Sequence, residues 1–141
     1  MSASTEAVQA WLREVVIGEG LCPWARRPFE RGLVHILEVQ GGEEQARVAL
    51  LAQAAALDAA GEGTTLLVLP EAPAAFEAFQ GWFHRAEDTL SAAGFDRRVQ
   101  VMGFHPAWII DGAPEAVHRV QRSPVAVLHL LRWAEVRAAV G

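Results

Sequence analysis

The sequence predicts a small α/β domain with a mostly parallel sheet of at least three strands. Two observations support this prediction. Apolar runs of strand length alternate with helical patterns of about 18–20 residues, in the order β-α-β-α-β that is typical of right-handed parallel crossovers. The runs are apolar throughout, as in strands that are covered on both faces. A ferredoxin-like sandwich, in which one strand pairs antiparallel, is the alternative.

Helices are expected to flank this central unit at both ends of the chain. The first spans 4–17, with Ser4 as its N-cap. Ser123 followed by Pro124 predicts a last helix over 124–139, because serine caps a helix and proline suits its first turn. No linker or repeat divides the chain, so a single domain over 1–141 is expected. The remaining expected elements are strands at 33–39, 64–69 and 99–104 and helices at 43–60 (with Leu50, Leu51, Ala54 and Leu57 inward), 73–93 and 114–120.

Composition excludes several classes of function. The 141-residue chain has a net charge of -5, whereas nucleic-acid binding needs a cationic surface. No apolar run is long enough to cross a bilayer and no signal-peptide pattern is present, so a cytoplasmic protein without a membrane partner is expected. The single cysteine permits no internal disulfide. The absence of lysine and tyrosine excludes Schiff-base chemistry and a Walker A lysine, and no cofactor is predicted.

His105 directly follows the strand expected at 99–104 and is the first candidate site residue. Pro106 cannot donate to a sheet, so the strand should stop there. In open parallel sheets, ligands bind at the carboxyl ends of strands. His105 is therefore expected to be either a site residue or a structural histidine.

The start of the last expected helix is the second candidate region. Its first turn would leave backbone N–H groups unpaired, and Arg122 precedes the cap Ser123 directly. Together these groups would form a seat for a carboxylate or phosphate. His129 and Arg132 would project from the same side of that helix. The simpler interpretation is a plain helix cap, a surface ion pair of Arg122 and a core histidine at 129.

Cys22 is the only thiol and the candidate nucleophile. Arg26 or Arg27 could lower its pKa, and His105 could act as its base. Taken alone, a small buried hydrophobe is the more common role of a free cysteine. A zinc site of Cys22, His105 and His129 lacks any supporting ligand spacing, so no metal is predicted.

Three short motifs in this order resemble the signature segments of the domain-of-unknown-function 1415 family. They are 21–25 (Leu-Cys-Pro-Trp-Ala), 104–106 (Phe-His-Pro), and 122–124 (Arg-Ser-Pro) followed by 128–132 (Leu-His-Leu-Leu-Arg). The resemblance covers nearly the whole chain. The family is uncharacterised, so it implies no activity. It does imply that Cys22, Pro23, His105, Pro106, Arg122, Ser123, Pro124, His129 and Arg132 are signature positions. The chain departs from the family pattern at Trp24, where phenylalanine is usual, at Gln121 and at 125–127.

The resemblance favours one pocket shared by these separated segments. In it, Cys22 would be a nucleophile or redox thiol, with His105 or His129 as its base. A small anionic metabolite would be held by Arg122, Ser123, Arg132, Arg26 and Trp24. Such a protein would be a thiol-dependent hydrolase or transferase. The alternative is a non-catalytic module that binds an anion or a partner, with Cys22 structural. The sequence does not decide between enzyme and binding module, nor does it indicate an oligomeric state.

Overall fold

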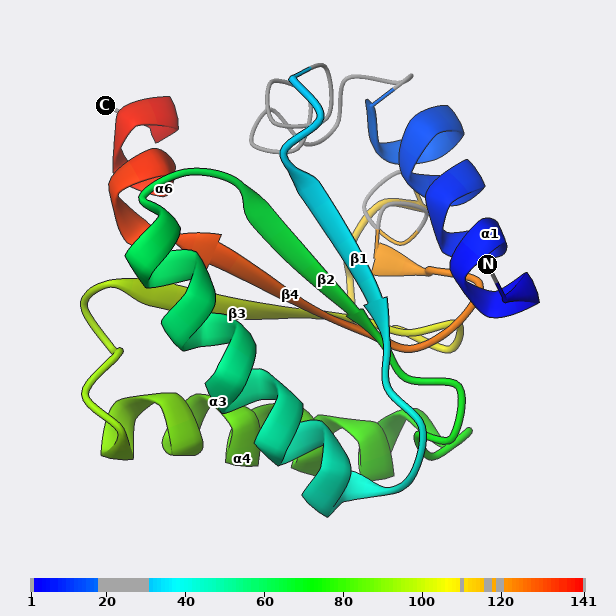
Figure 1. Ribbon diagram of the computed structural model, residues 1–141. Coiled ribbons are helices and arrows are strands. Elements are labelled where there is room, and N and C mark those ends of the chain that lie inside the picture. The colour runs from blue at the N-terminus through cyan, green and yellow to red at the C-terminus, as the bar shows by residue number, and fades with distance from the viewer. Residues whose placement is uncertain (1, 18–30, 110, 116–117, 119–120, 141) are drawn as a thin grey trace.

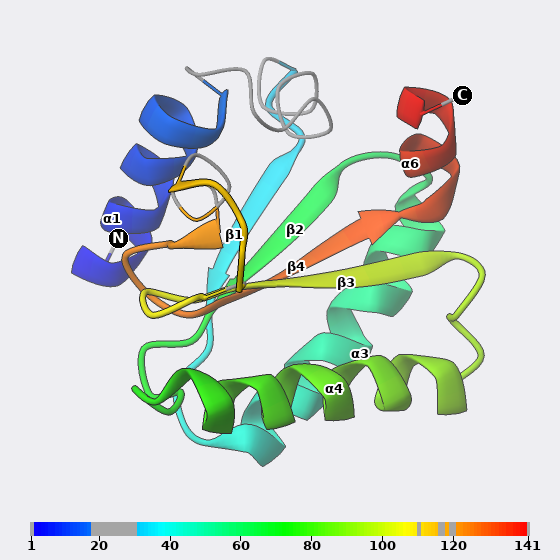
Figure 2. The ribbon, with the colours of Figure 1, turned by 180° about the vertical axis from the view of Figure 1, so that it is seen from behind.

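The protein folds around a four-stranded mixed sheet with helices on both faces (Figures 1 and 2). The computed structural model describes residues 2–17, 31–109, 111–115, 118 and 121–140. The sheet order is β1-β2-β4-β3. The strands are β1 (Val34–Glu38), β2 (Thr64–Val68), β3 (Val99–Phe104) and β4 (Val127–Arg132). The α/β class is thus confirmed.

Two helices cover one face of the sheet and one covers the other. Figure 1 shows α3 and α4 crossing the face opposite to α1, and Figure 2 shows the same layers from behind. The helices are α1 (Ala3–Trp11), which continues as the π-helical turn η1 (Leu12–Ile17), α3 (Glu43–Ala60), α4 (Phe76–Ala92) and α6 (Trp133–Val140). None of the helices in the described part of the chain is long and apolar enough to cross a membrane.

The expectation of a mostly parallel sheet is wrong, because a fourth strand lies between β2 and β3. β1 and β2 pair parallel, whereas β4 pairs antiparallel with β2 and with β3. The three expected strands do run in one direction, but only two of them are neighbours. One antiparallel strand agrees with the ferredoxin-like alternative, yet the order β-α-β-α-β-β differs from the β-α-β-β-α-β of that fold.

The last helix expected over 124–139 is replaced by β4 followed by α6. A short apolar run with β-branched residues fits a buried strand as well as a helix, and local pattern cannot separate the two. Pairing along both edges decides for the strand, because the backbone of β4 then has partners in β2 on one side and in β3 on the other. Ser123 does not cap a helix, since its Oγ donates to the carbonyl oxygen of Val125.

The helices begin and end for local reasons. Ser2, not the expected Ser4, caps α1, because its Oγ accepts from the backbone N–H of Thr5 at 3.1 Å. α3 has the bounds expected for it, and it ends at Gly61. The φ of Gly61 is 74°, in the left-handed region that glycine adopts without strain. Leu50, Ala54 and Leu57 of α3 are buried as expected, but Leu51 is only half-buried and lies outside the core.

The sheet separates two apolar layers. On the α3 and α4 side, Leu67, Leu128 and Leu130 of the central strands pack against Leu50 and Phe79. On the α1 side, another set of side chains forms the second layer: Val8, Trp11, Leu12, Leu66, Val68, Phe104 and Val127. Because side chains alternate between the faces of a strand, each residue of β4 belongs to one layer only.

Gly103 and Gly81 provide a matched test of this packing. A Cβ on Gly103 of β3 would lie 3.2 Å from Phe83 and 3.4 Å from Phe79, both large rings of the core layer. A Cβ on Gly81 of α4 would meet only the guanidinium of Arg85, which is flexible. We expect Gly103→Ala to lower the free energy of unfolding by about 1 kcal/mol, and Gly81→Ala to raise it by about 0.5–1 kcal/mol. Urea denaturation of both variants measures this, and equal effects would contradict the packing described.

Candidate functional site

His105 lies at the end of β3, as expected, but it is fully engaged in local structure. It is buried, and its ring stacks on Phe79 with centroids 4.9 Å apart. Nδ1 accepts the backbone N–H of Ala107 at 3.0 Å, so Nε2 carries the proton and donates to the carbonyl oxygen of Pro73 at 2.9 Å. Both ring nitrogens are thus used to fix the loops that precede α4 and follow β3. A base for Cys22 would need one of these nitrogens free.

His129 is buried in the middle of β4, on the α1 side of the sheet. Thr64 Oγ1 donates to the carbonyl oxygen of Leu130 at 2.7 Å, so it accepts from Nε2 of His129 at 2.6 Å. The imidazole is thereby held as the neutral form with its proton on Nε2. Burial lowers the pKa of His129 to about 4. Hydrogen bonds to the described residues engage Nε2 only.

The two histidines lie on opposite faces of the sheet. The ring of His129 lies 6.0 Å from that of Phe104, in the layer beneath α1. The ring of His105 packs against Phe76 and Phe79 of α4. The sheet therefore lies between the two imidazoles, and the described residues do not bring them into one pocket.

The helix start on which the anion seat at residues 122–126 depended is absent, because Val127–Arg132 is a strand. Arg122 donates through Nε to the carbonyl oxygen of Trp108 and through its guanidinium to Glu115 at 3.1 Å. Ser123 is buried, and its hydroxyl donates a hydrogen bond to the backbone carbonyl oxygen of Val125. Arg132 pairs with Glu135 at 3.3 Å, at the far end of β4. The two arginines therefore hold carboxylates of the protein, and the length of β4 separates them.

The predictions for the motif at 21–25 and for Arg26 and Arg27 fall outside the described residues. They concern Cys22 as nucleophile, Trp24 and Arg26 as ligand contacts, and Pro23 as a signature position. Within the part of the chain that is described, no three His, Cys, Asp or Glu side chains are grouped so as to hold a metal ion.

One hollow that sequence analysis missed lies between α3 and α4. It has a volume of about 620 Å³ and is lined by residues of α3, α4 and β4. Its apolar floor is formed by Ala46, Leu50, Trp82, Ala86 and Leu128, and its rim carries Glu43, Glu44, Arg47, Arg85 and Asp88. The available signal was the spacing of Trp82, Ala86 and Thr89 at i, i+4 and i+7, which places them on one side of α4 next to its buried Phe79 and Leu90.

Two ion pairs hold the charged rim of this groove, one between α4 and α3 and one within α3. Arg85 of α4 donates through Nε and Nη2 to both carboxylate oxygens of Glu43 at the start of α3. Arg47 donates in the same way to Glu44 one turn before it. These hydrogen bonds raise the pKa of both arginines and lower that of Glu44. No pair to a described residue is found for the fifth rim charge, Asp88.

Comparison with known proteins agrees with the motifs. A family model described as "Protein of unknown function (DUF1415)" matches residues 3–141. The chain belongs to the DUF1415 family. No curated protein and no solved structure matches the chain. Family membership therefore shows the relationship of this chain but implies no function for it.

His129 predicts a specific dependence of stability on pH. The unfolded imidazole has its ordinary pKa of 6.5, whereas the folded one has a pKa of about 4. Between these values only the unfolded state takes up a proton, so the stabilisation is complete above pH 6.5 and is lost as the pH falls toward 4. The loss amounts to about 3 kcal/mol, at 1.36 kcal/mol per pKa unit.

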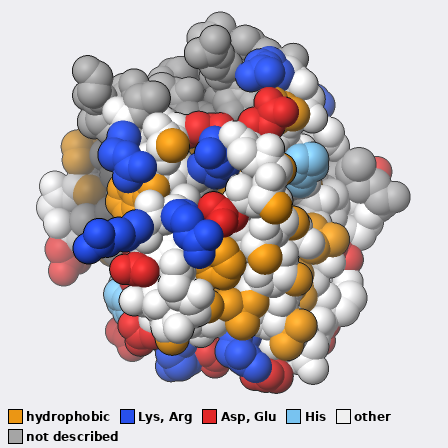
Figure 3. Space-filling model, turned by 60° about the vertical axis from the view of Figure 1, so that its left-hand side comes forward, with side chains coloured by type: hydrophobic (Ala, Val, Ile, Leu, Met, Phe, Trp, Pro, Cys, Tyr) orange, Lys and Arg blue, Asp and Glu red, His pale blue; other side chains and the backbone are white. Residues whose placement is uncertain are grey.

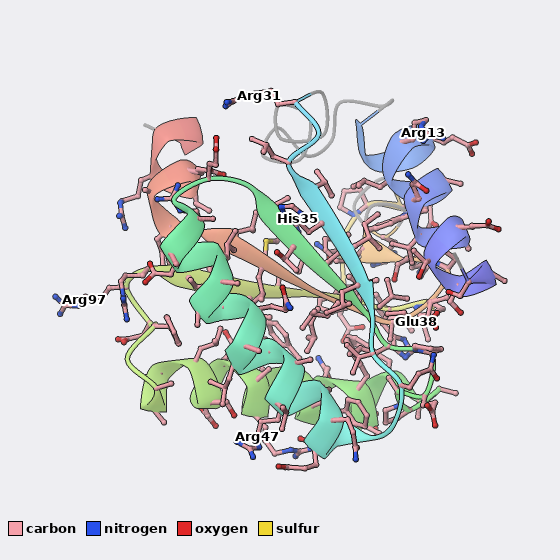
Figure 4. The ribbon with its side chains drawn as sticks, in the orientation of Figure 1. Arg13, Arg31, His35, Glu38, Arg47 and Arg97 are labelled. Atoms are coloured by element: carbon pink, nitrogen blue, oxygen red, sulfur yellow. The ribbon has the colours of Figure 1, made fainter. Side chains whose placement is uncertain are left out.

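Chemical denaturation at a series of pH values measures this loss. His129→Gln keeps an N–H donor but cannot titrate, so we expect its stability to fall less between pH 6.5 and 4 than that of the natural protein. His35→Gln is the control, because His35 is exposed on β1 (Figure 4). An equal pH dependence of His129→Gln and the natural protein would refute the buried neutral imidazole.

Proposed function

We propose that this chain is a non-catalytic binding module whose partner contacts the groove between α3 and α4. The observation that carries the proposal is the groove itself, with an apolar floor beneath a charged rim and a volume of about 620 Å³. Ligand-binding clefts typically measure about 300–1,000 Å³ and combine apolar walls with a few polar groups. The proposed occupant is accordingly an apolar group with polar or charged neighbours.

The histidines support a binding role over a catalytic one. His105 has no ring nitrogen left for proton transfer. His129, with a pKa of about 4, is a weak base for a thiol whose ordinary pKa is about 8.5. Moving the proton from such a thiol to His129 would cost about 6 kcal/mol, at 1.36 kcal/mol per pKa unit. The polar groups that suggested an enzyme therefore fit a structural role better.

An anionic metabolite is the less favoured ligand. Arg122 and Arg132, the two guanidiniums expected to hold it, each bind a carboxylate of the chain. The rim arginines Arg47 and Arg85 do the same. A ligand that inserts an apolar group between α3 and α4 needs none of these pairs to break.

A thiol-dependent enzyme is the second candidate, and one observation favours it. The indole Nε1 of Trp11 is buried and has no hydrogen-bond partner among the described residues, and it lies in the same layer as His129. Buried donors nearly always have a partner, so a polar ligand atom could be what this N–H serves. Alkylation of Cys22 with iodoacetamide across pH tests this candidate. A Cys22 thiol that titrates near 8.5 favours the binding module. A thiol that titrates below 7 in the natural protein, and no longer does so in His129→Gln, favours the enzyme.

The groove can be tested with the fluorescent probe anilinonaphthalene sulfonate, which binds apolar clefts. Thr89 lines the groove, whereas Ser91 lies on the exposed side of the same helix. We expect Thr89→Trp to fill the groove and weaken probe binding about tenfold or more, equivalent to about 1.4 kcal/mol. Ser91→Trp adds the same side chain outside the groove and should leave the affinity unchanged. The proposal fails if the natural protein binds no probe or if both variants bind it equally.

A further inference from the structure

The charges that line the groove between α3 and α4 do not balance. The rim has fewer guanidiniums than carboxylates, with Arg47 and Arg85 against Glu43, Glu44 and Asp88. One negative charge is therefore in excess. Figure 3 shows side chains of both charges close together along the lower border of the molecule, the height at which Figure 1 places α4 and the start of α3.

Asp88 is the carboxylate that remains without a partner. It is exposed on α4, and no ion pair joins it to another described residue. The basic residues one turn before it on α4 are His84 and Arg85, and each contacts another carboxylate. Arg47 of α3 does so too. The basic groups of the two helices that lie nearest to Asp88 are thus already engaged.

Exchange of partners along the rim does not remove the excess charge. Exposed ion pairs contribute only about 0–1 kcal/mol each, so Arg47 or Arg85 can leave its carboxylate for Asp88. That exchange leaves a different carboxylate unpaired, because three carboxylates share two guanidiniums. A cation that enters from outside the chain is what balances the charge of the groove.

An apolar surface lies beside this charge. Trp82, Leu50 and Leu128 belong to the floor of the groove. Asp88 follows Trp82 by six residues on α4, which is about 9 Å along the helix. A ligand whose apolar group packs on Trp82 therefore needs only a short chain to bring a charged group to Asp88. The volume of about 620 Å³ is that of a cleft for a small molecule.

We propose that the groove binds a small amphiphilic cation, in which an aromatic or other apolar group packs on Trp82 and an ammonium pairs with Asp88. This inference rests on the proposed function and deepens it by naming the class of ligand. An ammonium has three donors and no acceptor, so it complements a carboxylate, which only accepts hydrogen bonds. An anion of the same shape meets the excess negative charge instead.

Four small molecules that differ in one group test this assignment. Phenylbutylamine is an ammonium at neutral pH, phenylbutanol is its neutral counterpart, and phenylvalerate is its anionic one. We expect the amine to bind about threefold more tightly than the alcohol, and the acid about threefold more weakly, as an exposed ion pair allows. Butylamine has the charge of a lysine side chain but no ring, so it should bind at least about tenfold more weakly than phenylbutylamine. NMR titration of the isotope-labelled protein measures each affinity.

Asp88→Asn and Glu77→Gln form a matched pair of variants, since each replaces one exposed carboxylate of α4 with an amide. Glu77 does not line the groove, and it lies eleven residues before Asp88. That is about 16 Å along the helix, twice the Debye length of about 8 Å. We expect Asp88→Asn to abolish the preference for the amine and to bind the anionic probe anilinonaphthalene sulfonate about threefold more tightly. Glu77→Gln should behave as the natural protein does. A variant that had merely lost its structure would not change these two affinities in opposite directions.

The outcomes separate this inference from the proposed function. Equal binding of the amine, the alcohol and the acid would overturn the assignment of a cation and leave the groove proposal standing. A preference for the amine that persists in Asp88→Asn would do the same. Butylamine that binds as tightly as phenylbutylamine would also overturn it, because the charge alone would then suffice. If neither phenylbutylamine nor phenylbutanol binds, the groove proposal falls and this inference falls with it.

Discussion

The pairing of β4 with two neighbours is the constraint on which the rest of the structure depends. β4 fills the space between β2 and β3 and hydrogen-bonds antiparallel to both. Without it, each of these strands would present a row of unpaired backbone groups. Its alternating side chains also join the two layers, since Val127 lies beneath α1 and Leu128 and Leu130 lie beneath α3 and α4. His129 lies on this strand, and His105 directly follows Phe104 of β3, which pairs with Val127 of β4.

The described polar residues of the motifs around His105, Arg122 and His129 act mainly on the backbone. His105 holds Pro73 and Ala107, and Arg122 holds the carbonyl of Trp108. His129, Thr64 and the carbonyl of Leu130 form a chain of hydrogen bonds inside the sheet. Such groups stabilise one arrangement of loops and strands, because a buried polar group without its partner would cost about 1–3 kcal/mol. Histidines and arginines in short motifs can therefore serve the fold as well as a reaction.

Local patterns in the sequence predicted much of the fold but little of the site. α3 and the three apolar strands were predictable because periodicity, glycine and proline are signals within one segment. β4 was not, because its strand conformation depends on β2 and β3, which lie far from it in the sequence. The partners of His105 and Arg122 depend on the same long-range folding. The groove between α3 and α4 arises from the crossing of two helices, which neither helix specifies alone.

The position of β4 also bears on the order in which the chain can fold during translation. Domains generally fold as units as they emerge from the ribosome, at about 5–20 residues per second. Here the strand that completes the sheet spans residues 127–132, so it follows every other strand in synthesis. The nascent chain can pair β1 with β2, but β3 has no neighbour until β4 has emerged. An unfinished polypeptide would thus carry two open strand edges, which are the surfaces that chaperones and aggregating chains recognise.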